Sequence, residues 1–267
     1  MLTDFRNHAR LALVLDRRPV VLAGPNGAGK TNVLEAVSLL AAGQGLRRAP
    51  YPEIARRGGA GGWAVAATLQ TDHGPVEIGT GLDAARVDSQ RAARLVRLNG
   101  EPQQGSGALA GLVDMAWLLP SMDGLFTGPA SDRRRFLDRL VLGFDAGHAA
   151  RASQFERAMR QRNRLLDDGV RDANRFAGLE RIMAETGAAI AAARAETVAG
   201  LAQTILARRA RNPDSAFPWA SLALEGALEG DLAERPAVEV EDRYLATLAR
   251  GRERDRGAGR TREGPHR

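Results

Sequence analysis

The chain has 267 residues, 44% hydrophobic and 26% charged, with a formal net charge of +6, and at roughly 150 residues per domain this length predicts about two structural units. The sequence contains no cysteine, which excludes disulfides and thiolate chemistry. No apolar run has the length of a bilayer span or the pattern of a secretory signal, so we expect a cytoplasmic protein. The positive charge comes almost entirely from arginine, so from charge alone a nucleic-acid partner and a plain compositional bias are about equally favoured.

The first predicted elements lead into a glycine-rich loop. Partial alternation of apolar residues over positions 2–15 predicts a pair of half-exposed strands. The apolar run at residues 20–23 predicts a buried strand that enters the loop. Beyond the loop, residues 32–41 predict a helix, because apolar residues recur there at helical spacing. These residues are Val33, Leu34, Val37, Leu40 and Ala41.

The loop itself matches the phosphate-binding pattern G-x-x-x-x-G-K-[ST] without a mismatch. Its residues are Gly24, Pro25, Asn26, Gly27, Ala28, Gly29, Lys30 and Thr31. The glycines permit positive φ, so that successive N–H groups can surround phosphate oxygens. Lys30 would reach the β and γ phosphates, and Thr31 would offer its hydroxyl to Mg²⁺. Lys30 is also the only lysine of the chain, which favours this interpretation over a glycine-rich turn with an incidental lysine.

After the loop helix, the sequence predicts short strands separated by turns. Residues 43–48 predict a basic turn, and residues 58–62 predict a loop. Strands are expected over residues 63–70, 76–81 and 94–99, because glycine, aspartate and proline separate them. This half is therefore predicted to be mixed α/β with an antiparallel flap.

From residue 131 onward the sequence is mainly helical. Ser131 and Asp132 are typical of a helix cap before residues 133–142. A second helix is expected over residues 153–166, and after a break at 167–169 a third continues to about residue 205. The last two are expected to form an antiparallel hairpin, although core helices without a protruding arm fit the periodicity equally well.

The last segment is predicted to be the least regular. Residues 212–214 end the hairpin, residues 219–225 alternate like a strand, and residues 240–250 predict a helix. Residues 251–267 are rich in glycine and arginine and have no apolar face, so we expect a tail that packs no core by itself.

Five segments of the chain together resemble one known family. They are residues 4–8, residues 24–49, residues 118–141 (LLPSMDGLFTGPASDRRRFLDRLV), residues 161–166 and the closing Gly-Pro-His-Arg of residues 264–267. These segments resemble the RecF family of DNA replication and repair proteins. They follow one another in consistent order along the whole chain. The resemblance is therefore more specific than the P-loop, which also occurs in kinases, GTPases, helicases and transport ATPases.

RecF proteins are short-armed relatives of the SMC and Rad50 ATPases, and the resemblance implies an α/β fold. It would be a P-loop ABC-ATPase-like head with a mixed sheet and an inserted α-helical hairpin lobe. Residues 1–130 would form the N-terminal part of the head, residues 131–213 the helical lobe, and residues 214–267 an incomplete return to the head.

The resemblance also implies cofactors and partners. ATP and Mg²⁺ would be the cofactors, and single-stranded and gapped double-stranded DNA would be bound by an ATP-dependent homodimer. RecO and RecR would be partners in loading RecA at single-strand gaps, within DNA repair, replication-fork maintenance and the SOS response. Asp123 is a weak candidate for the loop that senses Mg²⁺ and the γ-phosphate.

The sequence departs from the family pattern at its end. In the family, Gly-Pro-His-Arg is followed by the signature motif, a Walker B strand and a catalytic glutamate, and none of these follows Gly264 here. We therefore interpret the chain as truncated near its C-terminus and name no catalytic residue. The family implies a weak DNA-stimulated ATPase, but turnover is expected to be negligible without these groups.

Five arginines are weak candidates for DNA contacts: Arg47, Arg48, Arg133, Arg134 and Arg135. Phosphate contacts from such groups give salt-dependent binding without sequence preference. A basic triplet at a helix N-terminus opposes the helix dipole, so packing against acids is an alternative role for the last three. The low aromatic content of 4% argues against base stacking.

Two other functions remain open at this point. A small-molecule kinase would use the same P-loop with an arginine-rich lid and a compact single lobe, and the long helical segment over residues 151–210 argues against it. A non-functional fragment, with strands of the head left exposed, is the other alternative.

Overall fold

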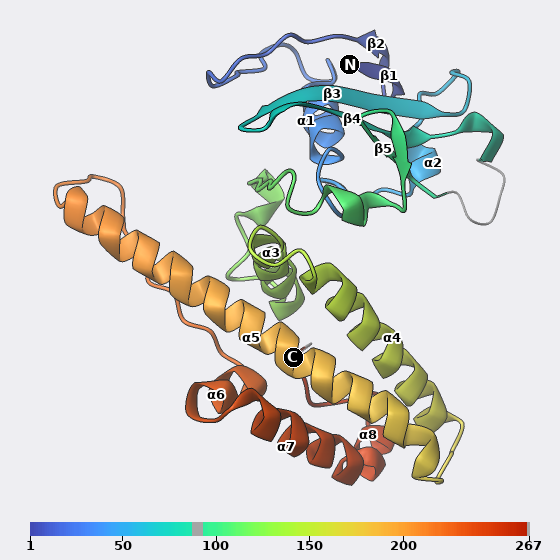
Figure 1. Ribbon diagram of the computed structural model, residues 1–267, viewed down its shortest axis with the longest axis vertical. Helices are drawn as coiled ribbons and strands as arrows, with labels where there is room; N and C mark the ends of the chain where they lie inside the picture. Colours follow the sequence, from blue (N-terminus) through green and yellow to red (C-terminus); the bar gives the residue numbers. More distant parts are fainter. Residues whose placement is uncertain (87–92, 266–267) are drawn as a thin grey trace. The chain divides into compact units, whose positions relative to one another are not determined.

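The computed structural model describes residues 1–86 and 93–265, and its contacts form two compact units, Met1–Trp117 and Leu118–Arg267 (Figure 1). This boundary lies before the expected one at residue 130. Residues 131–213 and the segment after them fall in the same unit, and the expected return of that segment to an ATPase head remains a prediction. His266 and Arg267 of the closing motif lie outside the described residues.

The first unit is built on an antiparallel sheet. Its strands are β1 Leu2–Phe5, β2 His8–Leu11, β3 Trp63–Thr71, β4 Gly74–Leu82, β5 Leu95–Leu98 and β6 Glu101–Gln103. Their order is β2-β1-β3-β4-β5-β6, and each recorded pairing is antiparallel. The expected N-terminal strand pair and the antiparallel flap are confirmed. Strand β6 was not expected, because it is three residues long and contains Pro102.

Two helices, α1 Lys30–Ser38 and α2 Tyr51–Ile54, pack against this sheet (Figure 1). Phe5 and Trp63 meet edge to face with their ring centroids 5.6 Å apart, and the Trp63 Nε1 donates to the Tyr51 carbonyl at 2.8 Å. Short 3₁₀ turns at Ala84–Arg86 and Ser106–Leu109 complete the unit, and Leu109 is fully buried. Alternating apolar residues on the strands therefore form one face of the core.

The strand expected at residues 20–23 is wrong. These residues have no regular secondary structure, and Val20 and Val21 are 52% and 86% exposed. A buried strand needs neighbouring backbone to pair its N–H and C=O groups. The described residues place no strand beside this run, so Val20 and Val21 stay exposed, whereas Leu22 packs partly buried against the core of the unit.

Helix α1 begins and ends earlier than expected, and its buried face is different. Leu34 and Val37 are exposed, whereas Glu35 and Ser38 are buried. Glu35 can be buried because two arginines pair with it, as described below. The Ser38 hydroxyl donates to the Glu35 carbonyl and accepts from the Leu46 N–H, so it too is satisfied.

The second unit is helical. After a 3₁₀ turn at Pro120–Met122 come α3 Ala130–Leu142, α4 His148–Asp167, α5 Asn174–Arg211, α6 Ala227–Glu234, α7 Ala237–Arg250 and α8 Arg252–Gly257. Helices α4 and α5 run antiparallel side by side, and α6 and α7 pack on α5 (Figure 1). The expected hairpin is confirmed, and Gly169 at φ 71° makes the turn at its break.

Two local expectations in this unit are wrong. Ser131 and Asp132 lie inside the first turn of α3, whose N-cap is Pro129, and no side chain caps the helix. The proline fixes an extended approach to the helix without a capping bond. Residues 219–225 form no strand, because the described residues of this unit offer the short alternating run no neighbouring strand for pairing.

Polar contacts hold residues 251–265 against the helices of the second unit, which the sequence did not predict. Asp255 and Thr261 are 1% and 2% exposed. Both bind Arg162 of α4, whose guanidinium is fully buried, at 2.8 Å each. A polar network therefore anchors the segment. Such an anchor leaves no apolar pattern in the sequence of the segment.

The same guanidinium also binds α5 and α7. Arg162 contacts Glu180 on α5 at 3.0 Å and the Leu248 carbonyl on α7 at 2.9 Å. Glu180 accepts a second arginine, Arg252, whose pKa this hydrogen bond raises. Each buried charge thus has opposite charges or hydrogen-bond partners, as burial requires.

A second polar cluster joins α3, α4 and α5. Asp138 accepts from Arg194 at 2.7 and 3.0 Å and lies 2.9 Å from the His148 Nε2. Burial by itself raises the pKa of Asp138, but the hydrogen bonds from His148 and Arg194 outweigh it, so the pKa is lowered. Arg194 also donates to the Pro265 carbonyl at 2.6 Å, which fixes the last described residue.

In the part of the chain that the structure describes, no helix combines the length and apolarity needed to cross a membrane.

Candidate nucleotide-binding site

The glycine-rich loop takes backbone conformations that glycine allows. Gly24, Gly27 and Gly29 have φ values of 148°, 84° and 94°, a region that side chains rarely adopt. Gly29 is the N-cap of α1, and its carbonyl accepts the Val33 N–H at 3.0 Å. The loop therefore passes directly into a helix N-terminus, where free N–H groups and the helix dipole favour an anion.

The ammonium of Lys30 lies on the loop itself. Its Nζ donates to the carbonyls of Gly24 at 2.7 Å and Pro25 at 2.8 Å. These carbonyls are weaker partners for an ammonium than phosphate oxygens are. Thr31 follows on the exposed side of the first turn of α1. The ammonium and the hydroxyl that the sequence predicts for phosphate and Mg²⁺ are therefore both accessible at the loop.

The turn between β1 and β2 supports the loop from one side. The Asn7 Nδ2 donates to the Gly27 carbonyl at 3.5 Å, and the Asn7 Oδ1 accepts from Asn32 at 2.8 Å. The His8 Nε2 lies 3.3 Å from the Gly29 carbonyl. These contacts were missed from the sequence, where Asn7 and His8 belonged only to the segment that resembles RecF.

Replacing Gly29 by alanine is expected to weaken ATP binding more than the same change at Gly27. An added Cβ at Gly29 would lie 2.5 Å from the His8 Nε2 and 2.6 Å from the Asn7 Oδ1, whereas at Gly27 nothing lies within 4 Å. Both positions have a left-handed φ, so the strain of about 1–2 kcal/mol is common to both. Titration of each variant with Mg·ATP measures the difference, and equal affinities would contradict the close packing of the turn on the loop.

The other end of α1 is held by Arg94. Its guanidinium donates to the carbonyls of Leu39 and Gly43, the latter at 2.7 Å, and to the Thr80 hydroxyl at 2.7 Å. Burial lowers the pKa of Arg94. A cation at the C-terminal end of the helix satisfies exposed carbonyls and complements the dipole. The helix that begins at the P-loop is thus fixed at both ends.

Arg47, a candidate for DNA contact, binds the side of α1. It donates to the Asn32 Oδ1 at 2.8 Å and to Glu35 at 2.7 Å. Arg6 makes two further bonds to Glu35, at 2.9 and 2.6 Å. Arg47 therefore has a structural role in neutralising a buried carboxylate, and its DNA contact stays a prediction. Arg48 is exposed at φ 53°, and its DNA contact likewise stays a prediction.

The basic triplet lies in the first two turns of α3. Arg133 donates to the Gly128 carbonyl at 2.8 Å, and Arg135 pairs with Asp132 at 2.8 Å. The packing role against acids and the DNA contacts of Arg133, Arg134 and Arg135 both stay predictions. Asp123 follows the turn Pro120–Met122 in the second unit, is exposed, and also remains only a candidate.

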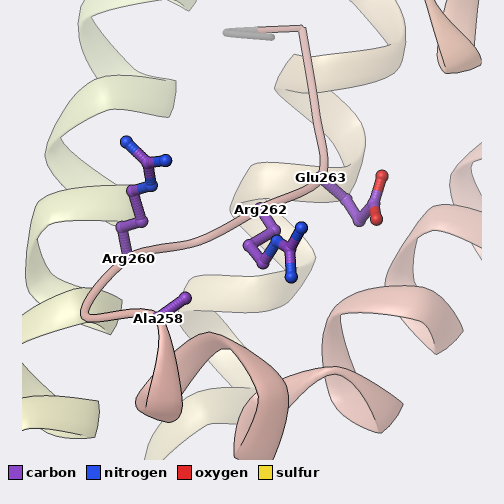
Figure 2. Close-up of a pocket in the computed structure, with 4 residues that line it drawn as sticks. All are labelled: Ala258, Arg260, Arg262 and Glu263. Carbon is purple, nitrogen blue, oxygen red and sulfur yellow. The ribbon is translucent and has the colours of Figure 1, made fainter.

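A hollow of about 390 Å³ lies in the second unit, lined by Ala258, Arg260, Arg262 and Glu263 (Figure 2). Its arginines extend in different directions from the segment after α8 (Figure 2). Its carboxylate, that of Glu263, pairs with Arg254 at 3.1 Å. None of these lining residues belongs to the P-loop.

The loop, its lysine and the helix that follows define a P-loop head, and comparison with known proteins identifies the family. No family model matches the chain. It is 55% identical over 267 residues to the DNA replication and repair protein RecF of Mesorhizobium japonicum, covering 100% of this chain and 69% of that protein. RecF of Rhizobium etli is 53% identical over 266 residues, and RecF of Agrobacterium fabrum is 52% identical over 267 residues, each with the same coverage. The chain belongs to the RecF family.

Solved structures support the fold. The chain superposes on a structure of "the recombination mediator protein RecF-ATPrS in RecFOR pathway" with a TM-score of 0.85 at 20% identity, covering 100% of this chain and 70% of that one. A corresponding RecF-ATP structure gives a TM-score of 0.80 at 19% identity. The expected α/β fold, an ATPase-like head with a helical lobe, is confirmed.

Proposed function

We propose that this chain is an ATP-binding and DNA-binding protein of recombinational DNA repair and replication. It would act as RecF does, at single-strand gaps with RecO- and RecR-type partners that help to load RecA, and in the SOS response. The observation that supports this most directly is the positive-φ glycine loop that carries Lys30 into a helix N-terminus, within a chain that belongs to the RecF family.

ATP would bind with its phosphates in the loop of residues 24–31. Lys30 would exchange the carbonyls of Gly24 and Pro25 for the β and γ phosphates, because charge-assisted bonds to phosphate are stronger. Among the described residues no group of three or more His, Asp or Glu is placed to hold a metal. Mg²⁺ would therefore be held by the Thr31 hydroxyl and the phosphates themselves, as is usual for this ion.

The partners are inferred from the family. The solved structures place RecF in the RecFOR pathway, and on this basis we propose RecO- and RecR-type partners for this chain. An ATP-dependent homodimer on single-stranded or gapped double-stranded DNA is proposed with them. A formal net charge of +6 favours association with a polyanion.

Binding of labelled gapped DNA, measured by fluorescence anisotropy with and without Mg·ATP, tests this proposal. We expect salt-dependent binding that strengthens when Mg·ATP is present, because nucleotide and DNA binding are coupled in a nucleotide-switched clamp. Lys30→Met should bind DNA with the same affinity whether or not Mg·ATP is added. A wild-type chain that binds no DNA, or that binds it identically with and without ATP, would overturn the proposal.

A further inference from the structure

We propose that the C-terminal end of α5 and the loop after it bind single-stranded nucleic acid. Arg208, Arg209 and Arg211 would contact the phosphates, and Phe217 would stack on a base. This inference rests on the proposed DNA binding and gives it a location in the second unit.

The end of α5 carries more positive than negative charge. Arg208, Arg209 and Arg211 all lie in its last turn, and residues 197–213 contain no acidic residue. Asp214 follows in the loop, and among the described residues no ion pair is recorded between it and these arginines. The positions four residues before these arginines are Thr204, Ile205 and Ala207, so the usual ion pairs of a helix surface are excluded. One basic residue would complement the helix dipole. Three concentrate more positive charge than the helix end requires.

These arginines are accessible. All three are exposed, and among the described residues no ion pair is recorded for them. The end of α5 extends beyond α6 and α7, which cover its middle part (Figure 1). By contrast, Arg194 on the same helix is buried and bound to Asp138. Exposed guanidinium groups without protein partners are free to neutralise phosphates.

An exposed aromatic ring follows the basic turn. Phe217 is 80% exposed, six residues after Arg211 and therefore no more than about 20 Å from it along the chain. The turn that presents the ring is ordered, because the Ser215 N–H donates to the Asn212 carbonyl at 3.3 Å and the Phe217 N–H donates to the Ser215 hydroxyl at 3.2 Å. Basic groups beside an exposed ring suit unpaired bases, which stack on aromatic side chains. An acidic peptide would use the arginines but not the ring.

The test compares the full chain with two triple variants, using a labelled oligothymidylate without nucleotide. We expect the variant Arg208→Gln/Arg209→Gln/Arg211→Gln to bind the oligonucleotide about tenfold more weakly at 50 mM salt. The slope of the logarithm of the binding constant against the logarithm of the salt concentration should become shallower by about 2, because each lost phosphate contact removes roughly 0.7. The control, Arg157→Gln/Arg160→Gln/Arg164→Gln, removes the same charge from exposed positions on α4 and should change affinity less than about twofold. Circular dichroism verifies that both variants are folded.

The variant Phe217→Ala tests whether this surface binds nucleic acid or another kind of polyanion. Loss of one stacked base should weaken binding about fivefold or more and leave the salt slope unchanged. If the α5 triple variant binds like the α4 control while the wild type binds DNA, the inference fails and the proposed function stands. If the wild type binds gapped DNA but no oligothymidylate, the inference fails and the proposed function stands; if it binds neither, both fail. If Phe217→Ala has no effect and polyglutamate competes as well as DNA, the surface serves an acidic protein and the inference is overturned.

Discussion

Replacing Arg162 by alanine is expected to lower the free energy of unfolding of the second unit by about 3–5 kcal/mol. The guanidinium is fully buried and binds Glu180, Asp255, Thr261 and the Leu248 carbonyl. Its removal leaves Asp255 without its buried cation and opens a cavity between α4, α5 and α8. Urea denaturation followed by circular dichroism measures the loss.

The matched control is Arg160→Ala on the same helix. Arg160 pairs with Glu156 at 3.4 Å, and both side chains are more than half exposed. Such surface pairs contribute about 0.5 kcal/mol or less. If Arg162→Ala costs no more than Arg160→Ala, the network around Arg162 does not hold the C-terminal segment in place.

Replacing Lys30 by methionine is expected to weaken the binding of Mg·ATP about 30-fold or more, which corresponds to about 2 kcal/mol for a lost bond to a charged group. Methionine has a similar length but donates no hydrogen bond, so the loop keeps its shape and loses the ammonium. Isothermal titration of both proteins with Mg·ATP gives the ratio of dissociation constants.

Arg18→Met serves as the control for this change. Arg18 lies before the loop and pairs with Asp16 on an exposed surface, so its loss removes the same charge without touching the P-loop. We expect its affinity for ATP to stay within about twofold of the wild type, as for an exposed charge. Equal losses in Lys30→Met and Arg18→Met would indicate that general positive charge, and not the ammonium of Lys30, attracts the nucleotide.

Local sequence signals predicted much of the fold. Strands β3 and β4 and the turn between them follow from alternating apolar residues and a glycine. Helix α5 follows from apolar residues spaced three and four apart. Such patterns are complete within a single segment, so they need no knowledge of the rest of the chain.

The features that were predicted wrongly or missed from the sequence depend on distant partners. Residues 20–23 have the composition of a strand, but pairing decides whether a strand forms, and the described residues place none beside them. Residues 251–265 have no apolar face, yet Arg162, some 90 residues earlier in the sequence, binds them through Asp255 and Thr261. Polar networks between distant segments leave no periodic signal in the sequence.

Part of the candidate site could likewise be predicted from local sequence, and part could not. The loop of residues 24–31 could be predicted from the sequence, because its glycines, lysine and threonine occur at a fixed spacing and each has a known chemical role in phosphate binding. The contacts of Asn7 and His8 with the loop could not be predicted. The sequence does not reveal that these residues contact the carbonyls of Gly27 and Gly29. The role of Arg47 in neutralising Glu35 was hidden for the same reason. Membership of the RecF family favours the repair function over the small-molecule kinase.

Calorimetric titration of the wild-type chain with ATP, ADP and AMP, each with Mg²⁺, tests most directly whether the loop of residues 24–31 recognises phosphates. We predict saturable binding of ATP, weaker binding of ADP and no measurable heat with AMP, because the loop amides and Lys30 contact the phosphates and not the base. AMP binding as tightly as ATP, or no binding of any of the three, would contradict this account.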